Sequence, residues 1–134
     1  MSSCRNSVSA IDFITDFAAI YPLEGNVYYS SASKSSDGYI SEELFRRIYS
    51  YDGQIPEDYA VVLNSRPERG AECGIFKVCS GTDIEAITEL CMNRINLLSQ
   101  RDNKGMVITS GEYVFYSTLD DQTRAKELFY RLIK

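Results

Sequence analysis

The chain has 134 residues, a size at which one ordinary domain can bury a hydrophobic core. Its hydrophobic fraction of 44% and charged fraction of 25% are close to globular averages, so neither a disordered nor a membrane-spanning chain is expected. The net charge of −5 argues against nucleic acid as a partner, because phosphates attract basic surfaces.

The first part of the chain predicts a helix, a short strand and a loop. Ser9 is suited to be the helix N-cap, with Asp12 three residues later, and Pro22 prevents the helix from continuing. Residues 25–30 are rich in types that favour a strand. Residues 31–38 are small and polar, and we expect a mobile loop there. Apolar residues of the helix recur at helical spacing: Ile11, Ile14, Phe17, Ala18 and Tyr21.

A second helix and an antiparallel hairpin are expected next. Ser41 predicts the N-cap of a short helix that ends near the turn at Asp52 and Gly53. Residues 58–64 place apolar side chains on both faces, which predicts an interior strand. A polar, glycine-ended loop over residues 66–70 leads into a strand over residues 72–79 and so predicts a hairpin. The short helix has these inward residues: Leu44, Phe45 and Ile48.

The strongest helical pattern begins at Thr82, which predicts a second capping box with Glu85. Residues 106–109 and 112–118 predict a hairpin across Ser110-Gly111, because glycine suits a tight two-residue turn. The main helix carries an apolar stripe, which Leu90 and Ala86 widen: Ile84, Ile87, Cys91, Ile95 and Leu98.

A final helix is predicted after Asp120 or Asp121, either of which is suited to cap it. Its core face consists of apolar residues: Ala125, Leu128, Phe129 and Leu132. The elements predict an α+β fold, with an antiparallel or mixed sheet of about five strands and helices packed mainly on one face. We expect a single two-layer domain over residues 9–134, preceded by a flexible segment over residues 1–8.

The chain contains no histidine, the side chain whose ordinary pKa lies nearest neutrality. Histidine-dependent triads and metal sites are therefore excluded. Ser31 and Lys34 have the spacing of a lysine-activated serine, but a serine-rich loop produces such a pair by chance. Paired carboxylates lack the spacing of a calcium loop and are interpreted as caps and solvated helix faces. We expect no catalytic residue, no metal and no cofactor.

The four cysteines are Cys4, Cys73, Cys79 and Cys91. Cys73 and Cys79 fall on one predicted strand, where a rise of about 3.3 Å per residue places them far beyond disulfide reach. Since the spacing of the four does not match a zinc site either, we interpret them as small buried hydrophobic residues.

Ten tyrosines are the remaining candidates for function. Tyrosine combines contact area with a polar hydroxyl and is enriched at recognition surfaces, but it is equally suited to the margin of a core. We expect the binding surface to lie on the side of the sheet that helices leave open. Three tyrosines on predicted strands are the candidates: Tyr59, Tyr113 and Tyr116.

Several stretches support a further expectation: residues 38–44, 48–49, 58–63, 72, 75–78, 83–95 and 111–114. Together they resemble a family of short, lipoprotein-like cell-envelope proteins of Gram-positive bacteria, which share a domain of unknown function. The resemblance spans most of the chain, but the family has no established active site to carry over. It implies an extracytoplasmic location and an anchor on a lipidated cysteine, for which Cys4 is the candidate.

The chain departs from the family pattern before Cys4, where it has neither the charged nor the apolar segment of a signal peptide. Either an exported precursor has been trimmed and Met1 added, which we favour, or this member is cytosolic. The expected function is a non-enzymatic binding module of the cell envelope that recognises a protein or wall-associated ligand, with no transmembrane segment. The alternatives are a cytosolic regulator or inhibitor that occludes a partner protein, and a small enzyme that uses Ser31 and Lys34.

Overall fold

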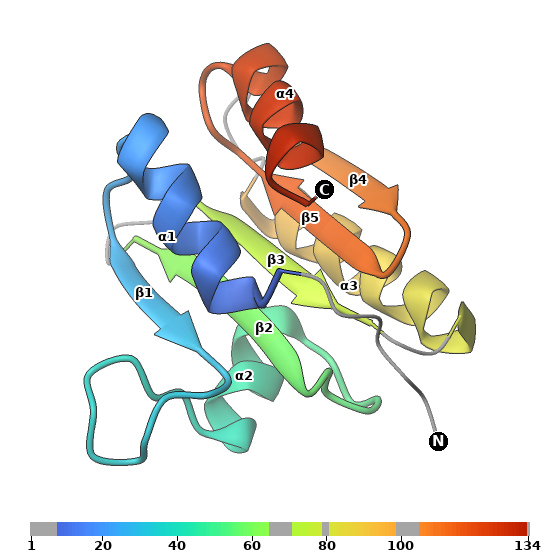
Figure 1. The fold of residues 1–134 in the computed structure, drawn as a ribbon. Coiled ribbons are helices and arrows are strands. Elements are labelled where there is room, and N and C mark those ends of the chain that lie inside the picture. The colour runs from blue at the N-terminus through green and yellow to red at the C-terminus, as the bar shows by residue number, and fades with distance from the viewer. Residues whose placement is uncertain (1–7, 65–70, 79–80, 99–104, 134) are drawn as a thin grey trace.

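Figure 1 shows the fold as a computed structural model, which describes residues 8–64, 71–78, 81–98 and 105–133. The predicted loop over residues 66–70 and most of the predicted N-terminal segment lie outside these ranges. The elements follow the chain in this order: α1 (Ala10–Ile20), β1 (Asn26–Tyr29), α2 (Glu42–Tyr49), β2 (Asp58–Leu63), β3 (Cys73–Lys77), α3 (Gly81–Leu98), β4 (Met106–Ser110), β5 (Tyr113–Ser117) and α4 (Gln122–Leu132).

The strands form one antiparallel, 5-stranded sheet in the order β1-β2-β3-β5-β4. β2 pairs with β3 and β4 pairs with β5, so both predicted hairpins are confirmed. After β3, α3 carries the chain to β4 at the edge of the sheet, and β5 returns between β4 and β3. The α+β class predicted from the sequence is therefore confirmed.

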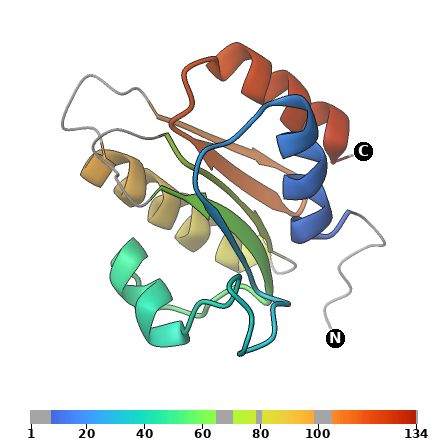
Figure 2. The same ribbon diagram turned by 90° about the vertical axis from the view of Figure 1, so that its left-hand side faces the viewer.

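Helices cover both faces of this sheet, as Figure 2 shows. α1 and α4 pack on one face, and α2 and α3 pack on the other (Figure 1). The expected layer of helices mainly on one face is not confirmed, and the structure has three layers. The reason is that successive strand residues point to opposite faces, and the central strands are apolar on both. Alternating β2 residues illustrate this: Ala60 and Val62 face α1, whereas Tyr59 and Val61 face α2 and α3.

Side-chain oxygens cap three of the helices. Ser9 Oγ accepts the N–H of Asp12 at the start of α1, and Ser41 Oγ accepts the N–H of Leu44 at the start of α2. Asp121, one of the two residues expected to cap the last helix, accepts the N–H of Arg124. These caps satisfy N–H groups that have no partner inside the helix, so these three helices begin where the sequence predicts, whereas α3 begins at Gly81, before the predicted cap Thr82.

The buried face of α2 differs from the prediction. Phe45 and Tyr49 are buried, whereas Leu44 is 40% exposed. A helix turns about 100° per residue, so a small rotation of this short helix exchanges the residues that face inward. In α3, Ala86 is exposed and does not widen the stripe. The centre of the stripe is buried as predicted: Ile87, Leu90, Cys91 and Ile95.

The turn between β4 and β5 lies one residue later than predicted. Ser110 pairs with Tyr113, so the turn residues are Gly111 and Glu112. Gly111 has a φ of 58°, in the left-handed region that glycine adopts without steric cost. A Cβ at this position would have no neighbour within 4 Å, so glycine is required here for its backbone conformation and not for space.

Candidate functional site

The three tyrosines predicted to form a binding surface lie in inner strands of the sheet. Their exposed fractions are 6% for Tyr59, 4% for Tyr113 and 0% for Tyr116. Because helices cover both faces, Tyr113 and Tyr116 lie inside the protein and not on a surface, which corrects the expectation for these two. Tyr113 instead donates a hydrogen bond to the carbonyl oxygen of Val8 at 2.6 Å. Tyr59 differs, because it is one of the residues that line a hollow.

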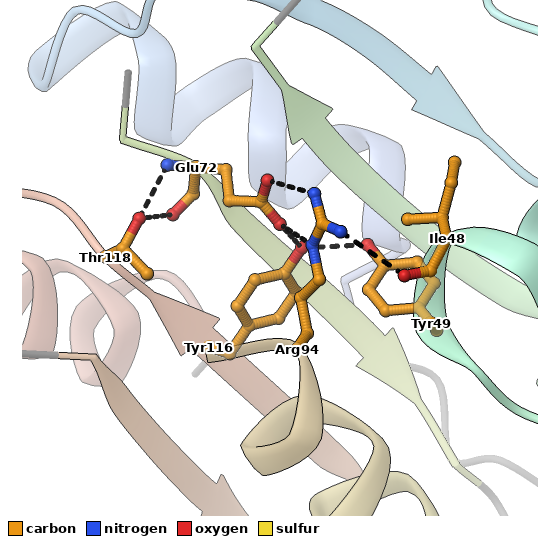
Figure 3. Close-up of polar contacts among 6 residues, drawn as sticks. All are labelled: Ile48, Tyr49, Glu72, Arg94, Tyr116 and Thr118. Carbon is orange, nitrogen blue, oxygen red and sulfur yellow. Dashed lines mark hydrogen bonds and ion pairs between the residues drawn. The ribbon is translucent and has the colours of Figure 1, made fainter. Parts of the chain in front are cut away.

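Tyr116 belongs to a buried polar network that the sequence analysis missed (Figure 3). At its centre, Glu72 lies directly before β3 and is 2% exposed. Arg94 of α3 donates from Nε to Oε2 and from Nη2 to Oε1 of Glu72, each at 2.9 Å. This pair of parallel bonds matches the planar guanidinium to both carboxylate oxygens, so it fixes the relative orientation of the two groups.

Two tyrosine hydroxyls extend the network in a defined direction. The hydroxyl of Tyr116 donates to Oε2 of Glu72 at 2.6 Å. Since that uses its only proton, the hydroxyl of Tyr49, 2.8 Å away, donates to the oxygen of Tyr116. Burial, with a further contribution from the charge of Glu72, raises the pKa of both phenols well above the ordinary value. Both hydroxyls therefore stay protonated and remain donors at neutral pH.

The same network reaches α2 and β5. Arg94 donates from Nη1 to the carbonyl oxygen of Ile48 at 3.3 Å, and its guanidinium carbon lies 5.9 Å from the ring centre of Tyr49. The main chain of Glu72 is held by Thr118, whose N–H donates to the Glu72 carbonyl at 2.9 Å. We name Glu72, Arg94, Tyr49 and Tyr116 the Glu72–Arg94 network. It joins α2, α3, β3 and β5 inside the protein, so it holds elements together.

The end of β1, the start of α2 and the start of β2 lie close together (Figure 1). Residues at these positions line a shallow hollow that is open to solvent. Its volume is about 370 Å³. Because its lining comes from strand, helix and loop residues that are distant in sequence, only the folded chain forms it. Among the described residues, the lining consists of Ser30, Ile40, Glu42, Arg46, Gln54, Ile55 and Tyr59.

Main-chain pairing fixes the position of Tyr59 in the hollow. The N–H of Ser30 donates to the carbonyl oxygen of Tyr59 at 3.0 Å, and the N–H of Tyr59 donates to Oγ of Ser30 at 2.9 Å. These bonds extend the pairing of β1 with β2 by one residue beyond Tyr29. The ring of Phe45, in α2, lies 5.0 Å from the ring of Tyr59 and covers it.

Arg46 ties the wall of the hollow to the loop after α2. Its Nη1 donates to the carbonyl oxygens of Gly53 at 2.7 Å and Tyr51 at 3.3 Å, and its Nη2 donates to Glu42 at 2.9 Å. The hydroxyl of Tyr51 in turn donates to the carbonyl oxygen of Gln54 at 2.7 Å. The side chain of Arg46 therefore holds the loop against α2. Arg46 and Glu42 also place one positive and one negative charge at the hollow.

The Tyr59 hydroxyl is the chemically distinctive group of the hollow. Burial, and then the neighbouring phenol of Tyr39, raise the pKa of Tyr59 to about 12, so the hydroxyl is protonated at neutral pH. Among the described residues, the hydrogen bonds of Tyr59 are made by its main chain alone. A hydroxyl without a partner among the described residues, on a residue that lines the same hollow as Ile40 and Ile55, can bind a ligand that offers an acceptor next to an apolar group.

Ser31 and Lys34 lie in the exposed connection between β1 and α2, which is not helical. The lysine-activated serine needs the two side chains on one helical turn. Within the described residues, no hydrogen bond joins them. The loop is instead organised by turns, in which Ser36 donates to the carbonyl of Ser33 and Tyr29 donates to that of Gly38.

Cys73 and Cys91 are buried, unpaired thiols on opposite faces of the sheet. Burial raises the pKa of both thiols, which keeps them protonated and weakly nucleophilic. They match the prediction of small buried hydrophobic residues. Cys4 and Cys79 lie outside the described residues. Among the side chains that the structure describes, no three acidic or cysteine residues gather as metal ligands would.

Comparison of the chain with protein-family models, curated proteins and solved structures finds no match. The resemblance to a cell-envelope family therefore stays a prediction. Of the helices in the described ranges, none is both long and apolar enough to cross a bilayer. The hollow is open to solvent, so a ligand can reach it. The Glu72–Arg94 network is buried, so a ligand cannot reach it.

One pattern in the sequence could have revealed the Glu72–Arg94 network. Arg94 follows Cys91 by three residues and precedes Leu98 by four, so it lies in line with the apolar stripe of α3. An arginine in that line needs a buried acceptor. Nothing local in the sequence distinguishes the hollow, because its lining residues are ordinary on their own elements.

Proposed function

We propose that the protein is a non-enzymatic binding module that recognises a segment of a partner protein through the hollow. The observation that carries this proposal is Tyr59, which lines a partly apolar hollow and whose hydroxyl makes no hydrogen bond to the described part of the protein. A polar group held in such a place supports recognition, because a ligand acceptor would complete its hydrogen bonding.

The size and chemistry of the hollow favour a short protein segment as ligand. Its volume of about 370 Å³ has room for one or two side chains. An aliphatic side chain of the partner would contact Ile40 and Ile55, and a neighbouring main-chain carbonyl would accept from Tyr59. Glu42 and Arg46 would meet polar groups at the margin, as in the polar rim of a protein interface.

Tyr59→Phe tests the proposal, because it removes only the hydroxyl. Immobilised wild-type protein is incubated with two fractions of a cell-envelope extract from the native host, one of soluble proteins and one of soluble peptidoglycan fragments. The captured ligand is purified and its affinity measured by calorimetry. We expect a protein ligand, and an affinity about threefold to tenfold lower for Tyr59→Phe, since one neutral hydrogen bond is worth about 0.5–1.5 kcal/mol.

Tyr130→Phe is the matched control, because it removes an exposed tyrosine hydroxyl from α4 on the opposite face. It should bind like the wild type. Equal affinities for wild type and Tyr59→Phe would show that the ligand binds elsewhere. Capture from the peptidoglycan fraction alone would replace the protein ligand with a wall-associated one. Turnover of a substrate that Arg46→Ala or Tyr59→Phe abolishes would end the non-enzymatic proposal.

A location at the bacterial cell envelope is part of the proposal and is supported by the family resemblance of the sequence. It assigns Cys4 as the lipid attachment site of an exported precursor. Expression of the complete native reading frame with an alkyne-labelled fatty acid tests this. We expect label in the membrane fraction and none for Cys4→Ser. Unlabelled protein that fractionates with the cytosol would contradict the assignment.

One observation favours a second candidate, a cytosolic regulator or inhibitor that occludes a partner protein. Cys73 and Cys91 are free thiols, and free thiols are typical of a reducing compartment. This candidate uses the same hollow and the same kind of partner. It predicts that the captured ligand is an intracellular enzyme or regulator whose activity falls on addition of the wild-type protein but not of Tyr59→Phe.

A further inference from the structure

α2 forms one side of the hollow, although it is a helix of only 8 residues. Its N-terminal turns contribute Glu42 and Arg46 to the lining, and Phe45 covers the ring of Tyr59. The position of α2 relative to β2 therefore decides whether the hollow exists and how much of Tyr59 is accessible. Whatever holds α2 in place controls the shape of the candidate site.

The far end of α2 is held by the Glu72–Arg94 network (Figure 3). Arg94 donates to the carbonyl oxygen of Ile48 and lies over the ring of Tyr49, and the hydroxyl of Tyr49 reaches Tyr116. The network therefore contacts the last turn of α2 at the main chain of Ile48 and at the side chain of Tyr49. Glu72 gives Arg94 a fixed orientation, since it is bound at both carboxylate oxygens.

We propose that Glu72 and Arg94 are positioning residues for the hollow, which set the place of α2 against β2 and so the accessibility of Tyr59. This proposal rests on the proposed function in one respect, which is that the hollow is a binding site. The geometric coupling from Arg94 through Tyr49 to Phe45 stands on the contacts themselves, and Arg46 follows Phe45 in the same helix.

The chemistry of the Glu72–Arg94 ion pair indicates that it orients α2 in addition to stabilising the fold. A buried ion pair is costly to desolvate and contributes little net stability compared with apolar residues of the same size. Its advantage is orientation, because the guanidinium has enough donors in one plane to bind both oxygens of Glu72 and the carbonyl of Ile48 together. Lysine keeps the charge at this position but has no planar fork.

Arg94→Lys is therefore the informative variant, and the protein is observed without any ligand. In protein carrying ¹³C at the tyrosine ζ carbon, NMR follows the titration of Tyr59. In ¹⁵N-arginine protein, it follows the side-chain signals of Arg46. We expect Arg94→Lys to displace α2, to lower the Tyr59 pKa from about 12 towards the ordinary phenol value, and to shift the Arg46 signals.

Arg47→Lys is the matched control, because Arg47 forms an exposed ion pair with Glu43 on the same helix. It should leave the Tyr59 titration and the Arg46 signals unchanged. If Arg94→Lys does not fold, Tyr116→Phe replaces it. This change removes the bond to Glu72 and the acceptor of the Tyr49 hydroxyl but leaves the bonds of Arg94 in place, so both sets of signals should move in the same direction by less.

The proposal is overturned if Arg94→Lys, or Tyr116→Phe in its place, lowers the denaturation midpoint while the signals of Tyr59 and Arg46 stay at their wild-type positions. The pair would then only stabilise the fold. This outcome is separate from failure of the proposed function, which is decided by ligand affinity in Tyr59→Phe. The hollow can be positioned by Arg94 even if its ligand differs from the one proposed.

Discussion

The guanidinium of Arg94 binds both carboxylate oxygens of Glu72 at 2.9 Å, although the two residues are 22 positions apart and lie on different elements. The side chain of Glu72 is 2% exposed and that of Arg94 is 14% exposed. Each residue of this buried pair depends on the other, because either one alone would be an unpaired charge inside the protein. This dependence leads directly to a measurable stability effect.

Replacing Arg94 with Met should lower the free energy of unfolding by about 3–5 kcal/mol, because it leaves the buried Glu72 carboxylate unpaired. Urea denaturation of the wild type and the variant measures the difference. The double variant Glu72→Met with Arg94→Met should recover most of the loss, since both charges are then gone. Arg47→Met, at an exposed pair, should stay within about 0.5 kcal/mol. A single-variant loss as small as that of Arg47→Met would contradict the burial of the pair.

Tyr49 and Tyr116 should contribute to a decrease in stability above about pH 10, in the same direction as the buried thiols and Tyr59. Burial, with the charge of Glu72 adding to it, raises the pKa of both phenols in the folded protein. In the unfolded chain they release protons near pH 10, so their contribution is complete below that pH and is lost as the pH rises towards the folded pKa. The loss is up to about 1.4 kcal/mol per pH unit for each group.

Urea unfolding between about pH 8 and pH 11.5 measures this decrease. Tyr116→Phe should show a shallower decrease than the wild type, because one of the buried groups whose pKa is raised by folding is absent. Tyr130→Phe should decrease like the wild type, since Tyr130 is 39% exposed. Parallel pH profiles for Tyr116→Phe and the wild type would show that Tyr116 does not keep its proton in the folded state.

Ile87→Ala should cost about 2–5 kcal/mol, because Ile87 is fully buried between α3 and the sheet and its removal leaves a cavity. Leu97→Ala, on the same helix but 52% exposed, should change the unfolding free energy by less than about 0.5 kcal/mol. Chemical denaturation of both variants gives the comparison. Similar small losses for the two would mean that α3 does not bury the predicted stripe.

Gly111→Val should destabilise the β4–β5 turn by about 1–2 kcal/mol, because a β-branched residue is strained at a φ of 58°. A Cβ at this position has open space around it, so we expect the cost to be conformational. Gly111→Asn should lose clearly less, since asparagine adopts positive φ more readily. Thermal unfolding separates the two variants, and equal losses would indicate a cause other than backbone strain.

Prediction from the sequence succeeds where a few neighbouring residues decide the outcome. Ser9, Ser41 and Asp121 cap their helices through bonds to N–H groups three residues later. Both hairpins follow from runs of strand-favouring residues joined by short loops. The facing of α2 is less predictable, because Leu44 and Tyr49 are both apolar and only contact with the sheet decides which one is buried.

The sequence by itself determined the α+β class, most element boundaries and the apolar face of α3, because capping, turn formation and helical periodicity act over a few residues. Only the tertiary structure decided that helices cover both faces, that Tyr113 and Tyr116 are buried, and that Tyr59 lines a hollow. The Glu72–Arg94 network likewise joins residues up to 67 positions apart. Such contacts depend on how complete elements pack, which no short stretch of sequence specifies.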